Sequence, residues 1–413
     1  MNPDGGNRPA ALKISAFDWT DFPSGLSSSP PVDYLRCYLA DLGAGAVIEE
    51  PNYFDRDYLA ELSACYSTSS RGYPNTCRRL HVFSVDARHA SALFNGALQG
   101  QPTALKKLQA AYLGFIVIRP LGATPLGRTV LRWYPETRRE APRVKRPARI
   151  YHVHLAGLPL TVEGLAWQQQ DSAVGACATV ALWTMLHSSA LDEHHAVPTT
   201  VEITRAAKAH WPLSHRIFPA SEGLVVEQLC HAIRAQGLQP SVLDGDEQVE
   251  LEGNIERAFS RRRFAASCAA LIRSGYPALI ACHMLVEDQP FVDHAVCAVG
   301  FRPAPPPKEP GVAVEDDELL EHLYIHDDNL GPSVRFALRE ENISTAPPVA
   351  VLDASPPPPL ERSPKMPNPT SSYPRLVPFS IVAALPDEIR MKSDFLNDKA
   401  MTLANRVALL LGR

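Results

Sequence analysis

The sequence predicts an α+β protein in which a helical half packs against an antiparallel sheet. The run from Cys177 to about Ser188 is apolar and rich in helix-forming residues, which indicates a buried helix. Short apolar runs separated by turn residues follow at 277–284, 291–301 and 323–338, and they are typical of buried strands. Helices and strands also mix in the region before residue 150, which predicts a further N-terminal α/β region.

Composition limits the class of protein. The chain has 413 residues, which favours two or three domains, and its 45% hydrophobic content is enough for a sizeable core. A formal net charge of −5 gives no general attraction to nucleic acid. Neither a secretory signal nor an apolar run near membrane-span length is present, so no membrane association is expected. The eight cysteines are scattered, which predicts reduced thiols and a cytoplasmic protein.

Proline-rich stretches and shifts in composition divide the chain into segments. One of them, with clustered prolines followed by acidic residues, is expected to project from a hairpin as an insertion. Residues 254–274 are expected to form a single helix. The expected segments are a flexible arm (1–31), an N-terminal α+β region (32–149), a catalytic domain (150–345) with the insertion (303–318), a Pro-rich loop (346–376), and a closing strand with a C-terminal helix (377–413).

A lone cysteine is the first candidate for chemistry. In the run Trp167–Leu186, a Gln-rich stretch leads through small residues to Cys177, and the helix follows. A sulfur at a helix start lies among free backbone N–H groups at the positive end of the helix dipole. That position favours the thiolate, which is the nucleophilic form. The alternative is a core cysteine at a helix start, because free cysteines are usually buried.

Two downstream strands supply partners for this cysteine. His294 opens the apolar run Phe291–Phe301, and Asp327 ends the apolar part of Leu323–Pro332. Cysteine, histidine and acid are the nucleophile, base and orienting group of a catalytic triad. Neighbouring residues of a strand face opposite sides, so only one of Asp327 and Asp328 should face His294. Asp327 is the preferred acid and Asp328 the alternative.

These motifs resemble those of papain-like cysteine peptidases. D-H-A-V-x-A-V-G at Asp293–Gly300 is similar to the histidine strand of that superfamily, and Tyr324–Asp327 resembles the strand that carries its Asn or Asp. The resemblance covers three short motifs between about 165 and 335 and is nearest in style to the bacterial, bacteriocin-processing branch. Two features depart from the papain family itself. Ala178-Thr179-Val180-Ala181 replaces Gly-Ser-Cys-Trp after the cysteine, and Asp171 occupies the usual position of the oxyanion glutamine.

The resemblance implies a papain-like fold and a cysteine peptidase that cuts a peptide or isopeptide bond in a protein or peptide substrate. It assigns the oxyanion hole to Gln170 and the Cys177 N–H, with Gln168 and Gln169 as alternatives. An acyltransferase of the transglutaminase type would use the same triad, and a binding module that has lost turnover is a third reading. No cofactor is expected. No metal is expected either, because the histidines and cysteines lack ligand spacing. The oligomeric state stays open.

Overall fold

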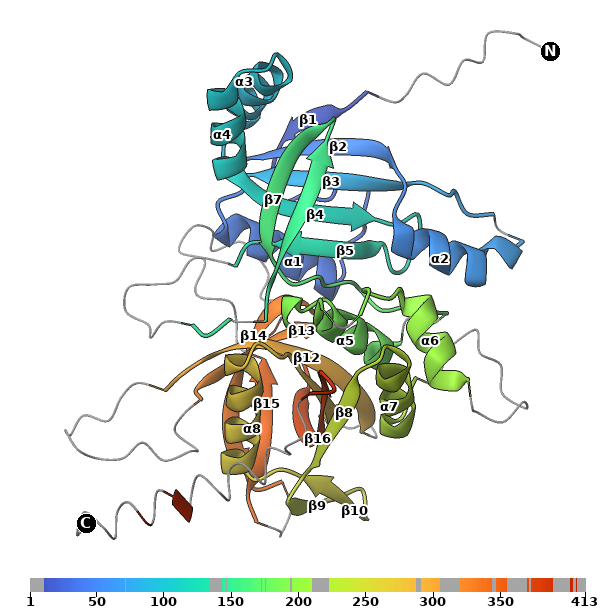
Figure 1. The fold of residues 1–413 in the computed structure, drawn as a ribbon, viewed down its shortest axis with the longest axis vertical. Helices are drawn as coiled ribbons and strands as arrows, with labels where there is room; N and C mark the ends of the chain where they lie inside the picture. Colours follow the sequence, from blue (N-terminus) through green and yellow to red (C-terminus); the bar gives the residue numbers. More distant parts are fainter. Residues whose placement is uncertain are drawn as a thin grey trace.

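The structure is a computed structural model in which two β-sheet units lie one above the other along the long axis (Figure 1). Most of the predicted insertion 303–318 and of the Pro-rich loop, and nearly all of the predicted C-terminal helix, lie outside the described residues. The described residues are 11–70, 72–133, 143–145, 147–171, 173–174, 176–193, 195–209, 223–286, 291–304, 320–343, 347–354, 370, 373–388, 402–403 and 406. Among them, no helix is both long enough and apolar enough to cross a membrane.

The N-terminal unit is a five-stranded antiparallel sheet with the strand order β1-β2-β3-β4-β5. Every residue of β4 is buried, because helices and a hairpin cover the sheet. The edge strand β1 lies inside the segment predicted as a flexible arm, so that part of the prediction is wrong. The elements are β1 (Lys13–Ala16), α1 (Pro30–Asp41), β2 (Ala46–Tyr53), α2 (Arg56–Ala64), β3 (Cys77–Phe83), α3 (Ala87–Leu98), α4 (Pro102–Ala111), β4 (Tyr112–Ile118), β5 (Leu126–Leu131) and the hairpin β6 (Arg149–Leu155) and β7 (Leu158–Gly164), with a short 3-10 turn at Tyr66–Thr68.

The second unit is a closed antiparallel barrel of six strands. Each strand from β11 to β16 pairs with the next, and β16 pairs back onto β11. One further strand, β8, extends the sheet from β16. The strands are β8 (Gln239–Asp244), β11 (Ala278–Leu285), β12 (Val292–Arg302), β13 (His322–Asp327), β14 (Gly331–Glu341), β15 (Val349–Ala354) and β16 (Arg375–Leu385), and a separate hairpin is formed by β9 (Glu247–Leu251) and β10 (Asn254–Ala258).

The predicted papain-like fold, a helical half packed on an antiparallel sheet, is wrong. The fold is mixed α/β, and the sheet closes on itself through the pairing of β11 with β16. The eight helices of the described residues are divided between the two sheet units instead of forming one half. Apolar runs reveal that a segment is a strand, but they do not reveal its partner, and the closing strands are separated by almost the whole barrel sequence. The remaining elements are α5 (Cys177–Leu186), a 3-10 turn at Ser189–Leu191, α6 (Thr200–Lys208), α7 (Val226–Ala235) and α8 (Arg261–Arg273).

The single helix predicted for 254–274 is also wrong in its first part. Asn254–Ala258 is strand β10, and α8 begins only at Arg261. The Ser260 hydroxyl accepts a hydrogen bond from the Arg263 N–H and so caps the helix. A serine one position before the helix is therefore the local signal that separates the two elements.

A short segment, residues 165–170, joins the two units. Trp167 exchanges backbone hydrogen bonds with Thr129 on β5 of the N-terminal sheet, and its indole N–H donates to the Asp327 carbonyl at 2.9 Å. The ring of Tyr34 from α1 lies so close to Gly331, the β14 residue that pairs with Asp327, that an added Cβ would meet it at 2.1 Å. The junction segment and α1 thus both contact the place where β13 ends and β14 begins.

Candidate active site

Cys177 is the first residue of α5. No side chain caps this helix start, so the N–H groups of its first turn are not used by a capping residue. Every following residue of the helix, Ala178–Leu186, is buried, as expected for a helix that is apolar on all sides. The thiol itself is half-buried and lines a groove. The helix is therefore buried except at its first residue, where the Cys177 side chain stays accessible.

His294 lies on β12 between the thiol and two acids. Its ring is buried, and its Nε2 lies 3.3 Å from Asp327 Oδ1. The ring and the Cys177 thiol line the same groove and interact, and because Nε2 faces the acid, Nδ1 is the nitrogen left for the thiol. Burial lowers the pKa of His294, but the charge and hydrogen bond of Asp327, the bond to Cys177 and the charge of Asp328 outweigh it, so the pKa is raised well above its ordinary value. The site favours an imidazolium.

The Asp327 carboxylate is fully buried and held at both oxygens. Oδ1 faces His294 and accepts from the Asn329 N–H at 2.9 Å, and Oδ2 accepts from the Tyr373 hydroxyl at 2.6 Å. Three donors on one carboxylate fix its orientation. Asp327 can therefore orient the His294 ring and stabilise its positive charge.

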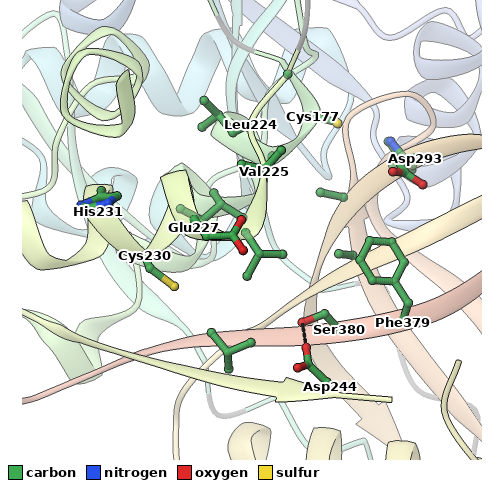
Figure 2. Close-up of a pocket in the computed structure, with 18 of the residues that line it drawn as sticks. Cys177, Leu224, Val225, Glu227, Cys230, His231, Asp244, Asp293, Phe379 and Ser380 are labelled. Carbon is green, nitrogen blue, oxygen red and sulfur yellow. Dashed lines mark hydrogen bonds between the residues drawn. The ribbon is translucent and has the colours of Figure 1, made fainter. Parts of the chain in front are cut away.

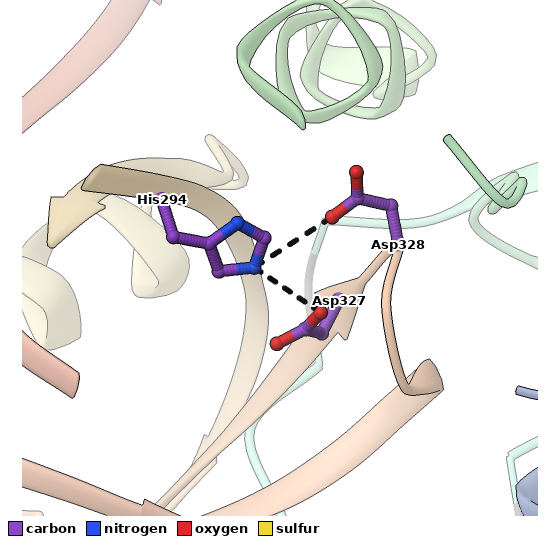
Figure 3. A group of neighbouring side chains, drawn as sticks. All are labelled: His294, Asp327 and Asp328. Atoms are coloured by element: carbon purple, nitrogen blue, oxygen red, sulfur yellow. Dashed lines mark hydrogen bonds and ion pairs between the residues drawn. The ribbon is translucent and has the colours of Figure 1, made fainter. Parts of the chain in front are cut away.

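Asp328 also faces His294, and the expectation that only one acid could do so is wrong. Its Oδ1 lies 3.7 Å from the same Nε2 (Figure 3). Alternation fails here because β13 ends at Asp327, its pairing shifts after Ile325, and Asp328 begins a turn. The carboxylate is 3% exposed, and neither oxygen has a hydrogen-bond partner among the described residues. Burial is the main cause that raises the pKa of Asp328 to about 7.

These three side chains have the spacing of a possible metal site. One ligand atom from each of His294, Asp327 and Asp328 lies within 4.8 Å of the others. A metal would need the lone pair of Nε2 and would have to displace the proton that His294 shares with Asp327. The raised pKa of His294 opposes that loss. The cluster is therefore better described as two carboxylates that share one imidazole proton.

The three glutamines take separate places. Gln170 Nε2 donates to Asn329 Oδ1 at 2.5 Å, and the Gln169 side chain accepts from the Leu126 N–H at 3.4 Å. The Gln168 amide nitrogen is buried without a hydrogen-bond partner in the described part of the chain. None of the three is among the groove residues that are described. The oxyanion role of Gln170 stays a prediction, and its hydrogen bond to Asn329 supports the turn that begins at Asp328.

The groove at Cys177 has a volume of about 720 Å³ and runs between α7 and the barrel (Figure 2). Cys177 and His294 line it together, so the thiol and the base meet the same space. Asp293 also lines the groove, where it accepts from His283 Nδ1 at 2.8 Å, and this contact accounts for its position. The apolar part of the lining includes Leu224, Val225, Val226, Leu229, Val242 and Phe379. No pattern in the sequence indicated that α7 would form one wall of the groove.

No protein-family model matches the chain, and a search of curated proteins finds no match. The structure defines a mixed α/β protein with a closed six-stranded antiparallel barrel. At the junction of its two units it brings Cys177, His294 and Asp327 together and adds Asp328 to them. The function is therefore inferred from the chemistry of this group.

Proposed function

We propose that this protein is a cysteine peptidase that hydrolyses a peptide or isopeptide bond through Cys177, His294 and Asp327. One observation carries the proposal. A single buried imidazole contacts an acid through Nε2 and lines the same groove as the Cys177 thiol, whose interaction with the ring helps to raise the pKa of His294. A thiol with a histidine base, which is in turn oriented by a third group, is the signature of an activated nucleophile.

The chemistry follows from this geometry. His294 takes the Cys177 proton, and the thiolate attacks the substrate carbonyl to form a tetrahedral intermediate. His294 returns the proton to the leaving amine, and a thioester remains on Cys177. Water, deprotonated by His294, then releases the acid and restores the thiol. The Cys177 N–H at the start of α5 can donate to the oxyanion, and one such donor contributes about 2.7–4 kcal/mol in comparable sites.

Transfer to an amine instead of water would use the same residues, so the second product distinguishes an acyltransferase from a peptidase. A reducing compartment such as the cytoplasm suits this chemistry, because all eight cysteines are free thiols.

The test uses Cys230 as an internal control, since it lines the same groove and is also half-buried. Burial raises the pKa of Cys230, so it should carry little thiolate at neutral pH. A peptide vinyl sulfone should label Cys177 in the wild-type protein, as mapped by mass spectrometry. Cys177→Ala should abolish labelling and cleavage of a peptide mixture, whereas Cys230→Ala should retain both. Equal labelling of the two cysteines, or cleavage by Cys177→Ala, would refute the proposal.

A further inference from the structure

We propose that Asp328 is a second positioning residue of this site, which acts with Asp327 on His294 and sets the pH range in which Cys177 reacts. The inference builds on the proposed function and concerns the regulation of the same site. Its starting point is the environment of Asp328, a buried carboxylate with both oxygens unpartnered among the described residues and with Oδ1 3.7 Å from His294 Nε2.

An unpartnered buried carboxylate is costly unless a charge compensates it. Asp327 has donors from Asn329 and Tyr373 besides His294, but the only positive group that approaches Asp328 in the described structure is the His294 ring. The interaction is therefore mutual. Asp328 as a carboxylate stabilises the imidazolium, and the imidazolium stabilises the carboxylate.

The other titratable groups around the pair remain neutral near pH 7. Tyr373, which faces both acids, has its pKa raised well above its ordinary value, chiefly by burial. Cys282 pairs with His294 across β11 and β12, and burial likewise raises its pKa well above the ordinary value. Of the groups around the ring, His294 and Asp328 are therefore the two whose pKa shifts bear on this pH range.

The direction of the effect follows from the position of Asp328. Its charge lies on the Nε2 side of the ring, whereas the thiol lies at the other nitrogen, so Asp328 supports the imidazolium more strongly than it repels the thiolate. When Asp328 is protonated, this support is lost and the thiol keeps its proton more readily. Because the pKa of Asp328 is raised to about 7, Cys177 should become more reactive as the pH rises through that value.

The test measures the rate of Cys177 alkylation by iodoacetamide from pH 5 to pH 9. In that reaction a carbon–sulfur bond forms, the carbon–iodine bond breaks and iodide leaves, and the thiol proton stays on His294. The wild-type rate should show an inflection near pH 7. Asp328→Asn should remove the inflection and lower the rate at pH 8 by about tenfold, which corresponds to one pKa unit. The control Asp353→Asn, on β15 outside the groove and paired with Arg339, should follow the wild type.

Each outcome has a separate meaning. If Cys177 in the wild type reacts no faster than Cys230, the proposed function fails. If Cys177 reacts fast but Asp328→Asn has the wild-type profile, only the role of Asp328 is refuted. Melting curves establish that the variants are folded. Should Asp328→Asn not fold, nitrogen NMR of the His294 ring in the wild type replaces it, and a ring signal without an inflection near pH 7 would overturn the inference.

Discussion

His326 and His294 lie on neighbouring strands, both are buried, and their pKa values shift in opposite directions. His294 faces two carboxylates and gains positive charge. His326 Nε2 donates to the Leu165 carbonyl at 3.0 Å, and its Nδ1 accepts from the Ser333 N–H at 3.0 Å. These partners require a neutral ring with its proton on Nε2, and burial lowers the pKa of His326 to about 4. His326 is thus a structural residue that ties β13 to the junction segment 165–170.

The neutral state of His326 should make the fold sensitive to acid. A histidine whose folded pKa is lowered contributes stability above its unfolded pKa of about 6.5, and that stability is lost as the pH falls toward 4. We expect His326→Gln to be less stable than the wild type at pH 7 because two buried hydrogen bonds are weakened. The difference in the free energy of unfolding should then shrink by about 2 kcal/mol between pH 7 and pH 5.

Urea unfolding of both proteins at several pH values measures this difference. Burial also lowers the pKa of His187 and of His81, but both rings are present in the two proteins, so their contributions cancel. A difference that stays constant with pH would show that His326 does not titrate in this range.

At the scale of elements, the closing pair of the barrel determines the geometry of the site. His294 on β12 pairs directly with Cys282 on β11, and β11 in turn pairs with β16. Tyr373, which donates to Asp327, lies two residues before β16. The last described strand of the barrel therefore supports the histidine strand through β11, and the segment that leads into it supplies a donor to the acid.

Truncation of Ile381 on β16 tests this closure. Ile381 is fully buried and pairs with Ile280 on β11 and Leu243 on β8. We expect Ile381→Ala to lower the free energy of unfolding by about 2–5 kcal/mol, the range for large-to-small changes in a core. The matched control is Ile255→Ala on the β10 hairpin, where the side chain is 72% exposed and the cost should be within about 0.5 kcal/mol. Urea unfolding compares the two variants, and similar losses would contradict a closed barrel core.

For the whole molecule, a buried ion cluster connects the N-terminal sheet to the nucleophile segment. The Arg119 guanidinium, just after β4, lies 3.0 Å from Glu61 Oε2 and 3.7 Å from Asp171 Oδ2, and it donates to the Gln169 carbonyl. Asp171 Oδ1 in turn accepts from two N–H groups in the turn before Cys177, those of Ala173 and Val174. The N-terminal sheet therefore helps to support the segment that precedes Cys177 in the candidate site.

Removal of the arginine should destabilise the entire chain. Arg119→Met leaves the buried carboxyl groups of Glu61 and Asp171 without their partner, which should cost about 3–5 kcal/mol. Adding Glu61→Gln should recover part of that loss, because one buried carboxyl group without a partner is removed. The control Arg78→Met breaks the partly exposed pair with Glu49 on the same sheet and should cost about 1 kcal/mol or less.

Urea unfolding followed by tryptophan fluorescence measures these costs. Trp167 at the junction reports on both units, so one shared transition is expected. Separate transitions for the two units, or an Arg119→Met cost no larger than that of Arg78→Met, would contradict this link.

Sequence reasoning predicted those features that depend on neighbours along the chain. The helix that starts at Cys177, the apolar strand after His294 and the strand that ends at Asp327 each carry a local pattern, and the structure places them as α5, β12 and β13. Local patterns also led to errors where a boundary was missed. The prediction of one helix for 254–274 overlooked the Ser260 cap, and alternation was extended one residue beyond the end of β13 to Asp328.

Only the tertiary structure determined the closed barrel, the position of Asp328 beside His294 and the bond between Gln170 and Asn329. Each depends on contacts between residues that are far apart in sequence. Hydrophobic periodicity shows which face of a strand is buried, but not which strand will cover or pair with it. The pKa of Asp328 has the same origin, since the largest cause that raises it is burial, which the fold imposes.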